Sequence, residues 1–187
     1  MPRSFDTIAS AYAFLERISF GPYLQRARCY GLAQTEKPIQ RALLLGDGNG
    51  KLALEILKRY PKCRIVSIDL SSAMQDEARR RVKAHFGETP WNYHLTCADA
   101  RKCAFSMDGF DFIGLHFFLD CFSDEDCDML LEKCTLALKP GGTLSFADFN
   151  IPTKQPMRVF GWALIKALYF SFRLTTGLKT QRLPKLK

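Results

Sequence analysis

The sequence has no C-x-x-C pair, although seven cysteines are scattered along its 187 residues. Their odd number and irregular spacing exclude a paired disulfide framework and a zinc ribbon. Cys121, Cys127 and Cys134 follow one another at intervals that match no common zinc pattern, so we predict no metal site. The first residues also lack the basic start and the apolar run of a signal peptide. We therefore expect reduced thiols and a cytoplasmic protein.

Acidic residues are missing from the last part of the sequence. Residues 149–187 hold eight Lys or Arg residues and no Asp or Glu, so they carry the whole net charge of +8. Within them, residues 157–174 place three cations on one side of an apolar, aromatic helical pattern. Such a segment can lie in a membrane interface or pack over a sheet and line a pocket, and three cations argue against a membrane span. Because the rest of the chain has no evident basic face, we expect no nucleic-acid partner.

The chain is long enough for one domain with a real core and too short for two. Helical spacing predicts a helix over 5–19 and another from Pro22 to about Ala33. Short apolar runs predict strands at 41–45, 64–69, 92–97, 110–116 and 142–149, with helices at 51–60, 72–86 and 124–138. Strands that alternate with helices indicate βαβ units and an α/β fold with a parallel sheet. We expect capping boxes at Ser72 with Gln75 and at Ser123 with Asp126.

Three glycines, Gly46, Gly48 and Gly50, stand between the first predicted strand and the next helix. Glycines at this place allow a tight turn and let a ligand approach the backbone, and the helix directs its N–H groups at that ligand. Asp69 ends the second strand, where a carboxylate can accept both ribose hydroxyls, and Asp99 follows the third. The carboxyl ends of parallel strands line one crevice, so these groups predict a nucleoside site. A purely structural turn is the alternative interpretation.

A nicotinamide dinucleotide is the obvious rival ligand. Its fingerprint needs a third glycine at the position of Lys51, and a lysine there would crowd the contact between helix and strand. The spacing found here instead favours a nucleoside ligand without phosphates.

Four segments resemble the class I S-adenosylmethionine-dependent methyltransferases. They are LLLGDGNG (43–50), IVSIDLSSAM (65–74), CADA (97–100) and LKPGGTLSFADF (138–149). The resemblance covers residues 41–150 and implies a Rossmann-like, doubly wound sheet of order 3-2-1-4-5. It also implies S-adenosylmethionine as the cofactor and methyl transfer as the reaction.

The same resemblance implies roles for individual residues. Gly46, Gly48 and Gly50 would hold the methionine portion of the cofactor, and Asp69 would bind its ribose. Leu70 and Met74 would cover the adenine, Asp99 would contact its amino group, and Ala100 would be a further contact of the cofactor.

A narrower resemblance links residues 5–21 and 169–184 to the methyltransferases of ubiquinone and menaquinone biosynthesis. It implies a helical cap over 1–40, a core over 41–150 and a basic, apolar segment over 151–187. Tyr12 of the cap would face the cofactor. The relatives of this type methylate lipophilic quinone precursors or other small molecules, and the aromatic residues of cap and tail favour an apolar acceptor.

Two departures from the family pattern are visible. The family places an acid where this chain has Leu44, and we hypothesise that Asp47 substitutes for it in holding the amino group of the cofactor. The family also adds a hairpin after the fifth strand, and none is evident here. That strand would then be an edge, covered by the tail or by a partner subunit in a homodimer. The alternative is a non-catalytic relative that binds the cofactor or a membrane.

His116 is the candidate catalytic base, because it ends the fourth strand at the mouth of the predicted crevice. A neutral imidazole there can take a proton from a hydroxyl or phenol of the acceptor. The alternative is that His116 only lines the pocket or contacts the cofactor.

Overall fold

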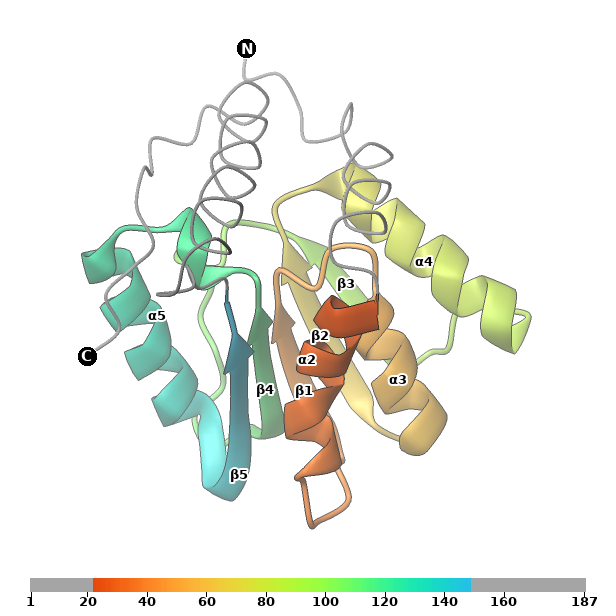
Figure 1. Cartoon of the computed structure of the whole chain (residues 1–187), viewed down its shortest axis with the longest axis horizontal. Helices are drawn as coiled ribbons and strands as arrows, with labels where there is room; N and C mark the ends of the chain where they lie inside the picture. The colour runs from red at the N-terminus through yellow and green to blue at the C-terminus, as the bar shows by residue number, and fades with distance from the viewer. Residues whose placement is uncertain (1–21, 149–187) are drawn as a thin grey trace, which may run out of the picture.

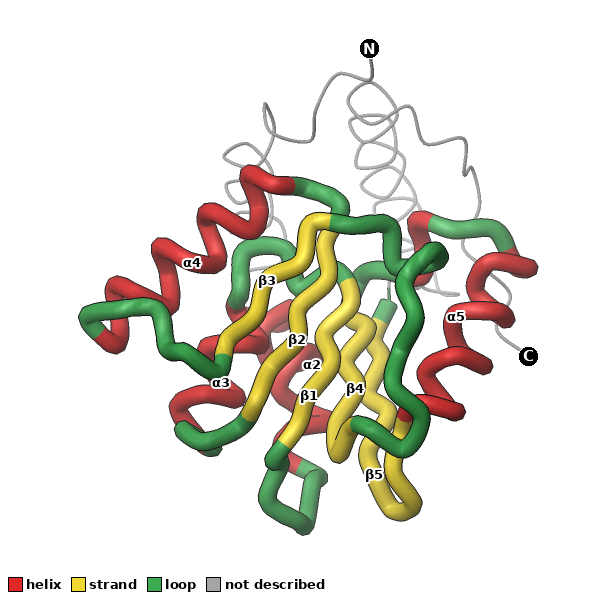
Figure 2. The backbone as a smooth tube through the Cα atoms, turned by 180° about the vertical axis from the view of Figure 1, so that it is seen from behind, coloured by secondary structure: helices red, strands yellow, loops and turns green. Residues whose placement is uncertain are grey.

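The computed structural model describes residues 22–148, and those residues form a five-stranded parallel sheet with helices on both faces (Figures 1 and 2). Its strands run in the order β3-β2-β1-β4-β5, as predicted. The elements in chain order are α2 (Pro22–Ala33), β1 (Arg41–Leu45), α3 (Lys51–Arg59), β2 (Arg64–Asp69), α4 (Ser72–Phe86), β3 (Tyr93–Cys97), β4 (Phe110–His116), the short 3-10 helix η2 (Leu119–Cys121), α5 (Asp124–Ala137) and β5 (Leu138–Ala147).

The central strands are apolar on both sides because helices or loops cover both faces. Leu44 of β1 and Phe112 of β4 belong to the core under α2, α3 and α4. Leu43 and Ile113, their neighbours along the two strands, belong to the core under α5 and the segment between β3 and β4. Figure 2 shows that segment crossing the face of the sheet that α2 and α3 leave open. Continuous apolar runs of this kind are what a doubly covered parallel sheet requires.

The fifth strand begins earlier than predicted, at Leu138, directly after α5. The register shifts here: Phe110 pairs with Leu138, but Phe112 already pairs with Thr143. The extra residues form a bulge in β5, and Gly141 with a φ of 75° supplies the backbone conformation that it needs. The prediction of a strand start at 142 was wrong because it treated this Pro-Gly-Gly segment as a turn outside the sheet.

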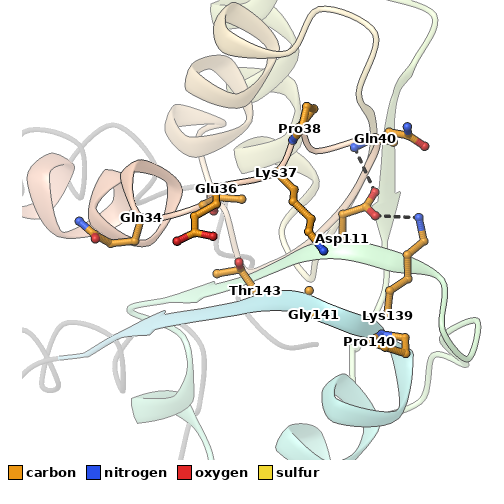
Figure 3. A pocket seen from close by; sticks show the side chains of 12 residues that line it. Gln34, Glu36, Lys37, Pro38, Gln40, Asp111, Lys139, Pro140, Gly141 and Thr143 are labelled. Carbon is orange, nitrogen blue, oxygen red and sulfur yellow. Dashed lines mark hydrogen bonds and ion pairs between the residues drawn. The ribbon is translucent and has the colours of Figure 1, made fainter.

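The bulge opens a polar hollow of about 540 Å³ at the amino-terminal edge of the sheet (Figure 3). Asp111 lines this hollow, and one of its carboxylate oxygens accepts a hydrogen bond from Lys139 Nζ at 2.7 Å. The other accepts from the backbone N–H groups of Gln40 and Arg41 at 3.0 and 2.8 Å. This network ties the start of β1 to β4 and β5, and it lies at the opposite end of the strands from the glycine loop.

One of the two predicted helix caps is wrong. The N-cap of α4 is Ser71 rather than Ser72, and its hydroxyl accepts from the backbone N–H of Met74 at 3.2 Å. Gln75 does not close a capping box but donates to the backbone carbonyl of Asp69. The N-cap of α5 is Ser123, which accepts from Asp126 N as predicted. No helix within residues 22–148 is long and apolar enough to cross a membrane.

Candidate functional site

The glycine loop follows β1 at the carboxyl edge of the sheet, and all three of its glycines have positive φ angles. They serve different neighbours. A Cβ on Gly46 would collide with the ring of Phe118, and one on Gly50 would lie 2.8 Å from the Cβ of Ala78 in α4. Gly48 is different, because only the sulfur of Met74, at 3.9 Å, lies near its missing side chain. The open approach to the backbone is therefore at Gly48.

Asp47 directs its carboxylate at the first turn of α3. Its two oxygens accept from the backbone N–H groups of Leu52 at 3.2 Å and Ala53 at 3.1 Å. Removal from water raises the pKa of Asp47 to about 6, although these two hydrogen bonds and the charge of Arg28 act the other way. Two of the N–H groups that the sequence assigned to a ligand are thus bound by the protein itself. The idea that Asp47 holds the amino group of a cofactor stays a prediction.

Asp69 at the end of β2 turns its carboxylate toward the glycine loop. One oxygen accepts from the backbone N–H of Gly48 at 3.0 Å, and the other accepts from the N–H of Ser71 at 2.9 Å. Desolvation raises the pKa of Asp69 above its usual value, while these backbone hydrogen bonds oppose the shift. The backbone N–H of Leu70 is a third donor to this carboxylate. A carboxylate has about four acceptor sites, so one site stays open for a ligand hydroxyl.

Two apolar side chains flank this carboxylate. Leu70 follows Asp69 directly and is 61% exposed, which is unusual for a leucine beside a buried strand end. Met74, on the first turn of α4, places its sulfur beside Gly48. Leu70, Met74 and Gly48 therefore offer an apolar surface next to Asp69, as a flat heterocycle attached to a ribose would require.

Asp99 lies in the turn after β3 and forms a fork-like ion pair with Arg101. The shortest contact joins Arg101 Nη2 to Asp99 Oδ2 at 2.8 Å, and the backbone N–H of Arg101 also donates to Oδ1. The hydrogen bonds from Arg101 lower the pKa of Asp99. Ala98 N donates to the backbone carbonyl of Asp69 at 3.1 Å, so this turn starts beside the end of β2. Ala100, the next predicted contact, is buried in the core against α5.

His116 ends β4 and is 7% exposed. Its Nε2 shares a hydrogen bond of 3.0 Å with the hydroxyl of Ser145 in β5. Burial, with the nearby charge of Arg28, lowers the pKa of His116 to about 4. The imidazole is therefore uncharged at neutral pH, as a base must be, but it is a weak one. Phe117, the next residue, has a φ of 57°, a strained conformation of the kind that clusters at functional sites.

Arg28 is a residue of this region that the sequence did not single out. It is buried in α2, and its guanidinium carbon lies 5.1 Å from the centroid of the Phe117 ring. The signal was present: Leu24, Arg28 and Leu32 follow at four-residue intervals, so the arginine interrupts an apolar helix face. A cation in that position indicates a buried polar neighbourhood, which here includes Asp47 and His116.

Leu44, which replaces the acid of the family pattern, is 1% exposed and packs in the core. A Cβ on Gly114 of the neighbouring strand would lie 3.2 Å from the Leu44 side chain. The site has no room for water around a carboxylate here. Tyr12 and the segment 157–174 lie outside the described residues, so their predicted roles stay predictions.

The site passes a simple test for a nucleoside cofactor. Gly48 leaves its backbone approachable, Asp69 reaches the loop, and Leu70 exposes apolar surface beside them. Asp99 fits less directly, because a ligand amino group would have to share the carboxylate with Arg101. Within residues 22–148 the structure thus brings the loop, Asp69, Leu70 and Met74 together, with the turn at Asp99 next to them.

Comparison with known proteins agrees with this geometry. A family model described as a methyltransferase domain matches residues 42–142. The chain is 32% identical over 152 residues to a ubiquinone/menaquinone biosynthesis C-methyltransferase of Geotalea daltonii, covering 79% of this chain and 62% of that protein. It is 29% identical over 162 residues to a malonyl-[acyl-carrier protein] O-methyltransferase of Halorhodospira halophila, covering 83% of this chain and 50% of that protein.

Among solved structures, the fold is similar to phosphoethanolamine N-methyltransferase 1 of Haemonchus contortus in complex with phosphoethanolamine and S-adenosylhomocysteine. The TM-score is 0.60 at 14% identity, and the match covers 80% of this chain and 32% of that one. This likeness shows the fold alone. The chain spans 50 to 69% of the length of the first curated relatives that it matches.

Proposed function

The chain belongs to the class I S-adenosylmethionine-dependent methyltransferases, and we propose that it binds S-adenosylmethionine at the Gly46–Gly50 loop and methylates a small, lipophilic acceptor. The observation that carries the proposal is the hydrogen bond from Gly48 N to Asp69 Oδ2. It brings the acid at the end of β2 onto the glycine loop, where one carboxylate can meet the ribose hydroxyls of a ligand that lies on that loop.

In this proposal, different residues around Asp69 contact different parts of the cofactor. Gly46, Gly48 and Gly50 shape the loop for the methionine portion, while Leu70 and Met74 cover the adenine. Asp99 and Ala100 approach the edge of the adenine from the turn after β3. Tyr12 would face the cofactor from the predicted cap, and Asp47 supports the loop by fixing the first turn of α3.

The bound cofactor would supply an electrophilic methyl group on a sulfonium. The protein then has to place the acceptor in line and keep water out. A base is needed only if the acceptor must lose a proton, and His116 is the proposed base for a hydroxyl or phenol. Its burial favours an acceptor group that reaches the end of β4 without surrounding water.

The acceptor class rests on the relatives and on the sequence. A ubiquinone/menaquinone biosynthesis C-methyltransferase and a malonyl-[acyl-carrier protein] O-methyltransferase are both similar to this chain. The apolar, basic segment 157–174 is proposed to line the acceptor pocket or to contact a membrane surface. A homodimer through the edge strand β5 is a further proposal, and we expect a cytoplasmic location and no nucleic-acid substrate.

The experiment that tests the function combines binding and turnover on one sample. A thermal shift with S-adenosylmethionine at one hundred times its dissociation constant should stabilise the protein by about 2.7 kcal/mol. A panel of quinone-like, lipid-like, peptide and nucleic-acid acceptors should then show methyl transfer to members of the first two groups. Binding without transfer to any acceptor would favour the alternative, a cofactor-binding relative without catalysis. Transfer confined to peptide or nucleic acid would reject the proposed acceptor class.

A further inference from the structure

The turn after β3 is held in place by hydrogen bonds from a lysine of α5. Lys133 Nζ donates to the backbone carbonyls of Ala100 at 3.0 Å, Arg101 at 3.0 Å and Cys103 at 2.6 Å. An ammonium group has three N–H donors, so all three are used on one turn. Its charge also lies 4.6 Å from the centroid of the Phe105 ring. Hydrogen bonds from a charged donor are among the stronger ones, so this contact fixes the turn firmly.

A second side chain of α5 holds the outer side of the same turn. Asp126 Oδ2 accepts from Arg101 Nη1 at 3.0 Å, and Arg101 in turn makes the fork-like pair with Asp99. Asp126 and Lys133 are seven residues apart, which places them on one face of the helix two turns from each other. One face of α5 therefore contacts the turn through two side chains, Lys133 and Asp126.

The sheet alone fixes this turn poorly. It follows β3, a five-residue strand at the edge of the sheet, and its own hydrogen bonds are short-range: Lys102 N to Asp99 O and Cys103 N to Ala100 O. Ala98 N reaches the end of β2 and Ala100 packs in the core, but the polar contacts described for residues 99–103 come from the turn itself and from α5. The position of residues 99–103 decides where the Asp99 carboxylate and the backbone of Ala100 lie relative to a bound adenine.

We infer that Lys133 is a positioning residue for the adenine end of the cofactor site, with Asp126 as its weaker partner. The inference rests on the proposed function, because it assigns the turn at Asp99–Ala100 to the adenine. In this inference Lys133 acts through the turn and does not itself contact the ligand. It sets the place of the backbone that does, so its loss should weaken every ligand that carries adenosine by the same factor.

The test uses two probes and four proteins in calorimetry. The probes are S-adenosylhomocysteine and 5′-methylthioadenosine, which shares the adenosine half and lacks the amino-acid half. The proteins are the wild type, Lys133→Met, Lys133→Arg and Lys139→Met. Lys139 is the matched control, because it too joins two elements through a short contact, to Asp111 at 2.7 Å, at the far edge of the sheet.

We expect Lys133→Met to raise the dissociation constants of both probes by the same factor, about tenfold, which is the worth of one charge-assisted hydrogen bond. Lys133→Arg should recover part of the loss, and Lys139→Met should lower the melting temperature without changing either constant. Equal dissociation constants for Lys133→Met and wild type would overturn the inference, as would a loss seen with S-adenosylhomocysteine only.

Two further results keep the outcomes separate. If Lys133→Met does not fold, Asp126→Asn removes the ion pair with Arg101 instead. This variant should raise the dissociation constants of both probes about two- to threefold, the scale of a surface ion pair. Wild-type constants in that variant would then overturn the inference. If the wild type itself binds neither probe, the proposed function fails, and that result does not depend on any variant.

Discussion

The Oδ2 atom of Asp69 accepts a hydrogen bond of 3.0 Å from the backbone N–H of Gly48. Asp69 is the last residue of β2, and Gly48 lies in the loop that follows the neighbouring strand β1. Gly48 has a φ of 58°, which favours glycine, and Asp69 directly follows the β2 residues Arg64 to Ile68, which pair with β1. The contact joins a strand-end acid to an approachable backbone, and the predictions that follow test what that contact does.

Replacing Gly48 should separate ligand binding from folding. In Gly48→Ala the new Cβ meets only the Met74 sulfur at 3.9 Å, so the cost to stability is the strain of a positive φ, about 1 kcal/mol. The same methyl group would stand where a ligand approaches the loop. We therefore expect the affinity for S-adenosylhomocysteine to fall at least about tenfold, which is 1.4 kcal/mol.

Gly87→Ala is the matched control for this variant. Gly87 also has a positive φ, 83°, with nothing within 4 Å of its missing side chain, and it ends α4 away from the loop. It should lose similar stability in urea unfolding and keep full affinity. If Gly48→Ala binds as tightly as Gly87→Ala, the loop does not hold the ligand.

His116 should affect turnover and leave cofactor binding unchanged. If it takes a proton from the acceptor, His116→Gln should lower kcat by about 10² to 10⁴ with an acceptor that must be deprotonated. Because the pKa of His116 is about 4, the imidazole is already neutral at pH 6, and the rate should show no inflection from this residue between pH 6 and 8. Rate measurements on both proteins over this range check the prediction.

The matched variant for His116 is Ser145→Ala, which removes its hydrogen-bond partner at 3.0 Å and keeps the ring. It should lower the rate less than His116→Gln does. Equal turnover by His116→Gln and the wild type would show that the histidine only lines the pocket.

Asp47 should make the stability of the fold depend on pH. Its pKa is raised from 3.8 to about 6 in the folded state, so the folded protein binds more protons than the unfolded chain between these values. The contribution of Asp47 is therefore full below about pH 4 and is lost as the pH rises through 6. The difference between these two pKa values corresponds to at most roughly 3 kcal/mol of the free energy of unfolding.

The measurement is urea unfolding of wild type and Asp47→Asn from pH 4 to 7. The amide can still accept one hydrogen bond from the first turn of α3 and cannot ionise. We expect the free energy of unfolding of Asp47→Asn to increase relative to that of the wild type as the pH rises. A difference between the two proteins that stays constant across this range would contradict the account of Asp47.

Much of the fold could be predicted from the sequence because burial leaves a direct mark on it. The strands at 41–45, 64–69 and 110–116 and the helix Pro22–Ala33 are confirmed to the residue. These segments are either apolar along their length or bounded by a strong signal such as Pro22. The family resemblance is confirmed as well, since the motifs around Gly46 and Asp69 are short and local.

The features that could not be predicted from the sequence depend on contacts between residues that are far apart in the chain. The start of β5 depends on how its bulge pairs with β4, and the partner of Asp47 depends on the path of the loop back to α3. Arg101 and Lys133 carry no motif, and their importance comes from a turn and a helix that only the fold brings together. Ser71 and Ser72 are adjacent and identical, so local pattern does not decide which one caps α4.

The most direct measurement is calorimetric titration of S-adenosylhomocysteine into the wild type, Asp69→Ala and the control Asp76→Ala. Asp76 is an exposed acid on α4 whose described ion pair is with Arg79 at 2.8 Å, so its loss should leave binding unchanged. The account predicts one bound ligand per wild-type chain and a loss of at least about tenfold in affinity, 1.4 kcal/mol, for Asp69→Ala. Binding by Asp69→Ala that equals the wild type, or no binding by the wild type, would contradict it.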